Sequence, residues 1–342
     1  MTQKTKIRNM EEFAAASGIS RPTVSKYFND PDSVRVSTRE RIERALEAHD
    51  YRPNIFAMNQ NRKATKNIGI VVPYLADPVF AEIARKTEQR CIDAGFRPTL
   101  YSAHGHRELE VEILDSLRSL KPAGVLMAPL GRGSDQAEIE KFCADVPTML
   151  FDSNIEGVGL AFSGSDNPQF ARLVVDYLCR TGEPPCFFEM KKPANPNANK
   201  RRQAYIAAME ALGLDPQIVS IDGEGWSFEE IGRLGGIKAL SENAFATNTI
   251  LCSNDRLAIG FLVACYERGL PVGLAEGSAI RVAGMDDHPF SRYTCPPLTT
   301  IAQDFDAVSG HAVDTLFRAI EGEEIEQRTV LFEGKLVMRQ SA

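Results

Sequence analysis

Hydrophobic and polar positions follow two patterns along this chain, and the change falls near residue 68. After it, short apolar runs alternate with longer stretches of helical periodicity. A first series predicts strands at Ile68–Val72, Pro98–Tyr101, Gly124–Ala128 and Thr148–Phe151, with helices at about Val79–Ala94, Glu108–Leu120 and Gln136–Ala144. A second predicts strands near Cys186–Glu189, Gln217–Ser220, Thr249–Leu251 and Ile280–Ala283, with helices at about Gln169–Arg180, Lys200–Leu212, Phe228–Leu240 and Asp255–Arg268. Strand–helix alternation is typical of parallel sheets with right-handed crossovers, so we expect two similar α/β lobes.

The first fifty residues are purely helical in pattern. The stretch Asn9–Asn29 predicts two short helices joined by a tight turn. Asn9 can cap the first helix, and Phe13 and Ala14 lie on its buried face. Gly18 ends that helix, because glycine adopts positive φ without a Cβ clash.

The second helix separates its residues by face. Ser20 can cap it, and Val24 and Phe28, four residues apart, point inward. The opposite face carries two cations and no acid, and consists of Arg21, Pro22, Ser25, Lys26 and Asn29. Such a helix after a glycine turn is typical of the recognition helix of a helix-turn-helix. The alternative is an ordinary surface helix pair with a solvated basic face.

A third helix and a linker follow. Ser37 and Glu40 predict a capping box at the start of the helix, and its buried stripe is Ile42, Ala45 and Leu46. Beyond it come a short helix-capable piece, Ile55–Gln60, and a polar linker, Asn61–Lys66.

Charge distinguishes the two parts of the chain. Residues 1–66 hold 13 Lys and Arg against 8 Asp and Glu, whereas the remainder holds 26 against 38. A basic head on an acidic body fits a polyanion that only the head contacts. The length of 342 residues predicts two or three compact units.

Several classes of protein are disfavoured. No run of eighteen apolar residues occurs, and the start MTQKTKIRN lacks the apolar region of a secretory signal, so we expect no membrane association and a cytoplasmic protein. The seven cysteines are scattered without a CxxC pair, which favours reduced thiols. His104 and His106 fit a solvated turn better than a metal site. No nucleophile–base pair can be named, so we expect no catalytic residues, no metal and no cofactor.

Motifs along essentially the whole chain resemble those of the LacI/GalR (lac repressor/galactose repressor) family. They are SGISRPTVSKYFN, VSTRERIERALEAHDYRPN, IGIVVPYLADPVFAEI, LCSNDRLAIG, VAGMDD and PPLTTIAQDFDAVSGHAVDTL. The resemblance implies an all-α helix-turn-helix head with a hinge helix, plus an α/β two-lobe core like periplasmic binding proteins, with two doubly wound parallel sheets. The expected boundaries are residues 1–66 for the head, with the hinge at about 54–61, and 67–342 for the core. Lobe 1 would comprise about 67–164 plus 301–331, and lobe 2 about 165–300 plus 332–342.

The resemblance also implies which residues contact DNA. Base edges fall to Arg21, Pro22 and Lys26, and Gln60 takes the place of the usual minor-groove leucine, for which Met58 is a possible substitute. The full expected set is Ser20, Arg21, Pro22, Ser25, Lys26, Asn29, Thr38, Tyr51, Asn54, Ala57 and Gln60.

Ligands of doubly wound lobes bind beyond the carboxyl ends of the strands. There the resemblance implies an effector site made by Tyr74, Asp77, Phe80, Asp152, Arg201, Trp226, Asn254 and Asp286. Planar Arg, carboxylates and aromatic faces suit a sugar or similar polyol, although Arg201 could instead meet a carboxylate or phosphate. Three alternatives stay open: Asp286 caps a turn, Asn254 caps the next helix, or Trp226, the sole tryptophan, belongs to the core.

The function expected from these observations is a ligand-responsive transcriptional regulator, a repressor of carbohydrate uptake or catabolism genes. The resemblance implies a homodimer on a near-palindromic operator, and the absence of a leucine heptad at the end of the sequence favours a dimer over a tetramer. A sugar in the cleft would change operator affinity through its differential affinity for two lobe arrangements. The alternatives are a cytoplasmic sugar-binding sensor and an enzyme on the same core, neither with specific DNA recognition.

Overall fold

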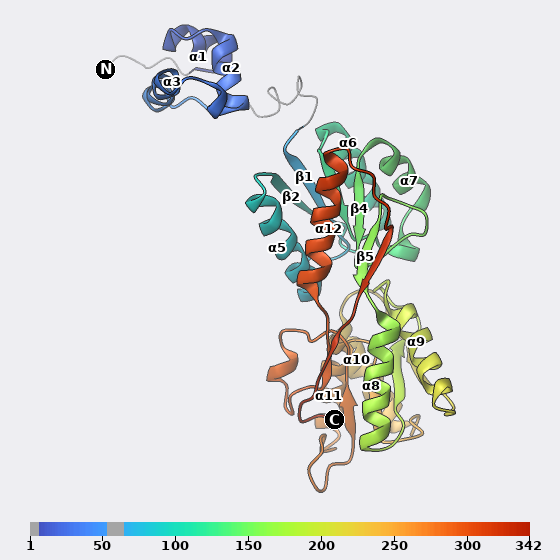
Figure 1. The fold of residues 1–342 in the computed structure, drawn as a ribbon. Coiled ribbons are helices and arrows are strands. Elements are labelled where there is room, and N and C mark those ends of the chain that lie inside the picture. The colour runs from blue at the N-terminus through green and yellow to red at the C-terminus, as the bar shows by residue number, and fades with distance from the viewer. Residues whose placement is uncertain (1–6, 53–64) are drawn as a thin grey trace. The chain divides into compact units, whose positions relative to one another are not determined.

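The computed structural model describes residues 7–52 and 65–342, apart from the side chain of Asn29. The chain divides into two compact units, residues 1–65 and 66–342, which we call the head and the core (Figure 1). The head holds α1 (Met10–Ser17), α2 (Arg21–Asn29), a 3-10 turn η1 (Pro31–Ser33) and α3 (Val36–His49). Its small hydrophobic centre comprises Phe13, Ala14, Ile19, Val24, Ile42 and Tyr51.

The expected ends of the first two helices are confirmed. The Asn9 side chain accepts a hydrogen bond from the Glu12 N–H at 2.8 Å, and Gly18 ends α1 with φ of 64°. The predicted capping box at Ser37 is wrong. The helix α3 begins earlier, after Arg35, with no side-chain hydrogen bond at its cap. Val34 is buried and anchors the chain two residues before α3, so Ser37 already lies inside the first turn of this helix.

Lobe 1 of the core is built on a six-stranded sheet with the order β11-β5-β4-β3-β1-β2, and every pairing is parallel. Its strands are β1 (Asn67–Val72), β2 (Arg97–Ser102), β3 (Gly124–Met127), β4 (Thr148–Phe151), β5 (Phe162–Ser165) and β11 (Thr329–Phe332). Its helices are α5 (Pro78–Asp93), α6 (Arg107–Leu120), α7 (Gln136–Asp145) and α12 (Phe305–Ile320).

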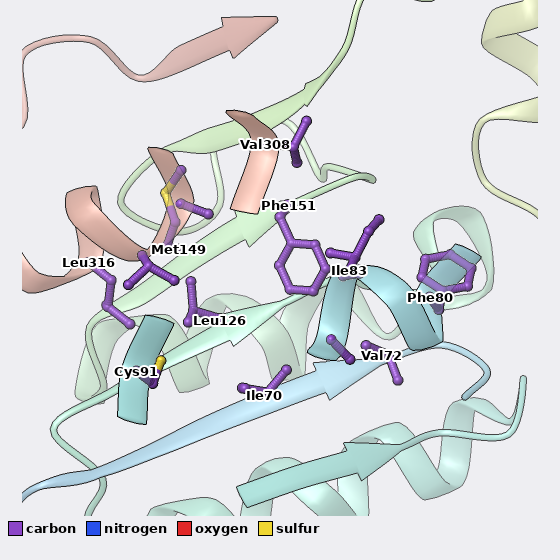
Figure 2. Packing of buried hydrophobic residues seen from close by; sticks show 14 of the residues in the cluster. Ile70, Val72, Phe80, Ile83, Cys91, Leu126, Met149, Phe151, Val308 and Leu316 are labelled. Carbon is purple, nitrogen blue, oxygen red and sulfur yellow. The ribbon is translucent and has the colours of Figure 1, made fainter. Parts of the chain in front are cut away.

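The two faces of this sheet are covered by different helices. Ile83 of α5 and Leu316 of α12 pack with Ile70 of β1 on one face, as Figure 2 shows. On the other face, Leu114 of α6 and Phe142 of α7 form a second cluster. Successive residues of β1 therefore point to opposite buried layers, which explains why that strand is apolar throughout.

Lobe 2 repeats the arrangement on a four-stranded parallel sheet with the order β7-β6-β8-β9. Its strands are β6 (Cys186–Met190), β7 (Gln217–Ile221), β8 (Thr249–Cys252) and β9 (Arg281–Ala283). The helices α8 (Asn167–Thr181) and α9 (Ala198–Ala211) contribute to one hydrophobic cluster, and α10 (Phe228–Ser241) and α11 (Asp255–Glu267) to another. The predicted fold class is confirmed.

The chain passes between the lobes three times. The passages lie between β5 and α8, between β9 and α12, and after β11. Short strands β10 (Thr300–Ala302) and β12 (Lys335–Val337) pair antiparallel along two of them. The sequence patterns did not predict α12, β5, β10, β11 or β12. Among the helices in the described ranges, none is long and apolar enough to cross a membrane.

Candidate functional site

The outer side of α2 carries the cations that were expected to contact DNA. Arg21, Pro22 and Lys26 are exposed and Ser25 is half-buried, whereas Val24 is fully buried in the head. Within residues 7–52 and 65–342, neither Arg21 nor Lys26 has a side-chain hydrogen bond or an ion pair. Their charges are therefore available to phosphates and base edges.

Other expected DNA contacts have a role inside the head. The Ser20 Oγ accepts a hydrogen bond from the Thr23 N–H at 3.4 Å and so caps α2. Tyr51 is buried, and its ring stacks on Phe13 with centroids 4.7 Å apart. Thr38 is half-buried in the first turn of α3. Contact between these residues and DNA stays a prediction.

The remaining expected contacts lie outside the described residues. These are the Asn29 side chain and the hinge positions Asn54, Ala57, Met58 and Gln60.

In the core, Arg201 and Asp286 form a buried ion pair between α9 and the loop after β9. The Arg201 Nη2 lies 2.5 Å from the Asp286 Oδ1. The same guanidinium donates to the backbone carbonyls of Ser253 and Met285 at 2.9 and 3.0 Å and to the Asn167 side chain at 3.2 Å. Arg201 is thus held by protein partners, and it leaves the Asp286 Oδ2 without a hydrogen bond from any described residue.

A second ion pair joins the two lobes. The Asp77 side chain caps α5 by accepting from the Val79 N–H at 3.0 Å, and its other oxygen accepts from the Arg256 Nη1 at 3.0 Å. Arg256, on α11, also pairs with Glu229 at 2.7 Å. Burial raises the pKa of Asp77, and the positive charge of Arg256 opposes this rise. The pair therefore connects the first loop of lobe 1 to a helix of lobe 2.

Aromatic rings also meet between the lobes. The ring of Trp226 stacks on Tyr74, with centroids 5.0 Å apart and an interplanar angle of 14°. Phe80 and Phe228 present their edges to it at 5.9 and 5.7 Å. Trp226 packs against the hydrophobic clusters of both lobes while staying partly exposed. Trp226 therefore packs on the core while it lies between the lobes, and its contact with an effector stays a prediction.

Asp152 follows β4 in a left-handed conformation, with φ of 58°. Asn197 of lobe 2 donates its amide to the Asp152 carboxylate at 3.1 Å. Burial raises the pKa of Asp152 to about 6, and the nearby charges of Lys200 and Arg201 oppose this rise. A buried carboxylate with few donors is suited to accept hydrogen bonds from a ligand.

Asn254 caps α11, as the alternative interpretation held. Its side-chain oxygen accepts from the Leu257 N–H at 2.8 Å. The adjacent Asp255 is buried and accepts from the hydroxyls of Ser291 and Thr300, both at 2.6 Å. Burial raises the pKa of Asp255 to about 7, and the charge of Asp286 adds to the effect. This turn thus holds the loop that carries Asp286.

Comparison with known proteins supports both units. Residues 9–54 match the family described as bacterial regulatory proteins, lacI family, and residues 179–342 match a periplasmic binding protein-like domain. The ribose operon repressor of Escherichia coli K12 is 26% identical over 340 residues, covering 97% of this chain and 99% of the relative. The chain belongs to the LacI family.

Other members extend the match. The repressor PurR of Pasteurella multocida is 26% identical over 97% of this chain and 98% of its own. The crystal structure of the lac repressor dimer bound to operator and the anti-inducer ONPF is 25% identical, with a TM-score of 0.84 over 98% of this chain and 99% of that one. This LacI-family protein is accordingly a DNA-binding transcriptional regulator with an effector-binding core.

Sequence reasoning missed three residues of the cleft. Arg256 forms the bridge between the lobes, and Asn197 holds Asp152. His288 is buried, its Nδ1 accepts from the Phe290 N–H at 3.2 Å, and its Nε2 has no hydrogen-bond partner among the described residues. The Asn197 Oδ1 is likewise buried without a partner. Arg256 lies within the motif LCSNDRLAIG, but nothing in the sequence marks its partner, and the roles of Arg256 and Asn197 follow from contacts with residues far away in the chain.

Proposed function

We propose that this protein represses transcription of genes for carbohydrate uptake or catabolism, and that a sugar-like effector between the lobes of the core controls its affinity for operator DNA. The carrying observation is that one chain joins a recognition helix, whose exposed Arg21 and Lys26 pair with no described residue, to a buried polar cleft between two lobes. The cations of α2 supply a salt-dependent affinity for DNA, and its polar face reads base edges.

The chemistry of the cleft favours a polyhydroxylated effector. The Asp286 Oδ2 and the Asn197 Oδ1 can accept hydrogen bonds. In neutral His288, whose pKa burial lowers, Nδ1 accepts a hydrogen bond, so Nε2 carries a proton to donate. A hydroxyl group both donates and accepts, so a polyol can pair with acceptors and with a donor alike, while the Trp226 ring can pack on its C–H face.

Relatives point to the same ligand class. One solved LacI-family structure, 22% identical, is complexed with D-xylulofuranose, and another of the same identity is a complex of CelR with cellobiose. We propose neither of these two sugars as the effector of this protein. The charged residues that line its own cleft would select the ligand.

The functional unit that we propose is a homodimer on a near-palindromic operator. Lobe 2 exposes large apolar side chains at Val263, Tyr266, Phe290 and Tyr293, which are 40%, 85%, 61% and 75% exposed. Such exposed apolar groups favour association with a second copy. Since operator DNA lies in the bacterial cytoplasm, the proposed function implies the same location for the protein.

Selection from randomised duplexes with the full-length protein tests the DNA part, and we expect a near-palindromic consensus. A screen of sugars by Trp226 fluorescence tests the effector part, because the ring lies between the lobes. The absence of any palindromic preference, with and without the sugars, contradicts the proposal. Turnover of a bound sugar would favour the enzyme alternative.

A further inference from the structure

The core has a second concave site, and the residues that line it differ from the expected residues of the cleft. It is a groove of about 940 Å³, bordered by the faces of α8 and α9 that turn toward each other and by the edge of the lobe 1 sheet. Figure 1 shows these two helices side by side, below β5. Phe162 and Leu331 line it from lobe 1, and Leu173 and Ala208 line it from lobe 2. None of the eight expected effector residues lines this groove.

The groove is long and apolar because α9 lines most of it with alanines, beyond Lys200 and Gln203 near the start of the helix. Ala204, Ala207, Ala208 and Ala211 recur at helical spacing on this face. Opposite them, α8 lines the groove from Pro168 to Arg180, which corresponds to roughly 18 Å of helix. Such a channel suits an elongated apolar body, whose burial removes apolar surface from water.

Positive charge lies at one end of the channel. The Lys200 Nζ, at the start of α9, donates to the Asn154 side chain at 2.8 Å and lies 5.2 Å from the centre of the Phe162 ring. Arg172, in the first half of α8, is exposed and has no ion pair or side-chain hydrogen bond within the described ranges. The acid of the groove, Asp176, is already paired with Arg180, the last cation of α8, at 3.0 Å. An anionic group can therefore pair with Arg172 without meeting an unpaired carboxylate.

We propose that this groove binds a small amphipathic anion, a molecule with an elongated apolar body and one carboxylate. The apolar body lies along the alanine face of α9, and the carboxylate pairs with Arg172 near the partly buried ammonium of Lys200. Because both lobes contribute walls, the bound molecule stabilises the lobe arrangement of this structure over others. The residues that line this site are not among those expected to contact the sugar or DNA.

Calorimetric titration of the full-length protein with decanoate tests the proposal, with decanol as the uncharged probe. We expect saturable binding of decanoate and weaker binding of decanol. The change Arg172→Gln should weaken decanoate binding two- to fivefold, as expected for a partly exposed ion pair. The matched control is Arg97→Gln, which removes an exposed arginine at the start of β2 and should change nothing.

A second pair of variants tests the channel itself. The change Ala208→Leu narrows it and should weaken decanoate binding at least tenfold, whereas Ala137→Leu, on the exposed side of α7, should leave binding unchanged. Unaltered thermal stability and Trp226 emission show that each variant is folded. The proposal is overturned by the absence of saturable binding, by binding that Ala208→Leu leaves intact, or by binding that Asp286→Asn abolishes, which places the anion in the cleft. A change of oligomeric state in Ala208→Leu also overturns it, because a second copy then occupies the groove.

Discussion

At the scale of single residues, the face of α2 separates affinity from specificity. Arg21 and Lys26 are both exposed and unpaired among the described residues, but only a planar guanidinium offers two parallel donors to one guanine. Charge alone attracts any duplex, whereas this geometry distinguishes one base pair from another.

The change Arg21→Ala should therefore relax preference at one base pair of each half-site, at a cost of about 1–3 kcal/mol in binding free energy. The control is Arg41→Ala, which removes an exposed arginine from α3 instead. Binding to consensus and randomised duplexes should then fall equally for the control and unequally for Arg21→Ala. Equal losses for both variants would contradict a base-reading role.

Asp152 gives the core a pH dependence whose sign follows from its environment. Its pKa rises from 3.8 to about 6 in the folded protein, first through burial and then through the charges of Asp286 and Asp77, while Lys200 and Arg201 oppose the rise. The folded state therefore binds this proton more tightly than the unfolded state. Stability from this residue is complete below pH 4 and is lost as the pH rises through 6.

The change Asp152→Asn should remove this dependence, since asparagine tolerates the left-handed backbone at this position. Between pH 4 and pH 7 the wild-type protein should lose up to about 3 kcal/mol of unfolding free energy relative to the variant. Urea unfolding followed by the Trp226 signal, which reports the core alone, measures the difference. Parallel pH profiles for the two proteins would refute it.

At the scale of elements, the turn between α1 and α2 sets how the recognition helix is presented. Gly18 has φ of 64°, and a Cβ added there would meet no atom within 4 Å. Backbone conformation alone therefore makes this position favour glycine.

The change Gly18→Ala should destabilise the turn by about 1–2 kcal/mol. Hydrogen exchange of peptides covering residues 9–29 in the full-length protein should then accelerate about 5- to 30-fold, with no change in peptides of the core. Gly157→Ala is the matched control, because it also has positive φ in open space but belongs to lobe 1. Faster exchange in the head of the control would show that the effect is not local.

The elements that the sequence predicted are those whose signals are local. The strand β1 is a continuous apolar run, and α5 begins at an Asp-Pro pair that caps a helix, so both could be placed without partners. The strand β5, with the sequence FSGS, is defined by pairing with β11, more than 160 residues later in the chain. No window of sequence contains that information.

The helix α12 was not predicted from the sequence for another reason. Its buried residues recur at helical spacing, but Gly310 interrupts the pattern with a residue that weakens helices. A Cβ at that position would lie 3.1 Å from the Arg90 guanidinium of α5. Glycine leaves room for this arginine side chain, a contact that only the packed structure shows.

The effector cleft, like the fold, was predicted from the sequence only in part. The residues of the cleft that were expected from the family resemblance do converge on the space between the lobes, as the Arg201–Asp286 pair and the Tyr74–Trp226 stack illustrate. Arg256 could not be predicted, because its role depends on Asp77 in the other lobe, and His288 could not, because its burial depends on the packing of the whole core.

At the scale of the whole molecule, the division of charge separates two binding events that must be coupled for regulation. Residues 1–66 carry a net charge of +5 and residues 67–342 carry −12, so DNA is attracted to the first part and repelled by the second. Coupling requires that the effector prefer one arrangement of the lobes. We expect Asp286 to be central to this preference, since its Oδ1 already accepts from Arg201 and Gln303 and its Oδ2 accepts no hydrogen bond from the residues that the structure describes.

The change Asp286→Asn should therefore reduce affinity for the effector at least tenfold and abolish its influence on DNA binding, because a buried charged acceptor is lost. Operator affinity without effector should stay within about twofold, since no contact of the head is altered. Asp287→Asn is the control, because the neighbouring Asp287 carboxylate pairs with Arg339 at 2.6 Å. Asparagine tolerates the positive φ of this residue. Fluorescence titration with the effector and binding to operator duplex give the two readouts. A folded Asp286→Asn protein that loses both would show that this residue maintains the DNA-binding state rather than sensing the ligand.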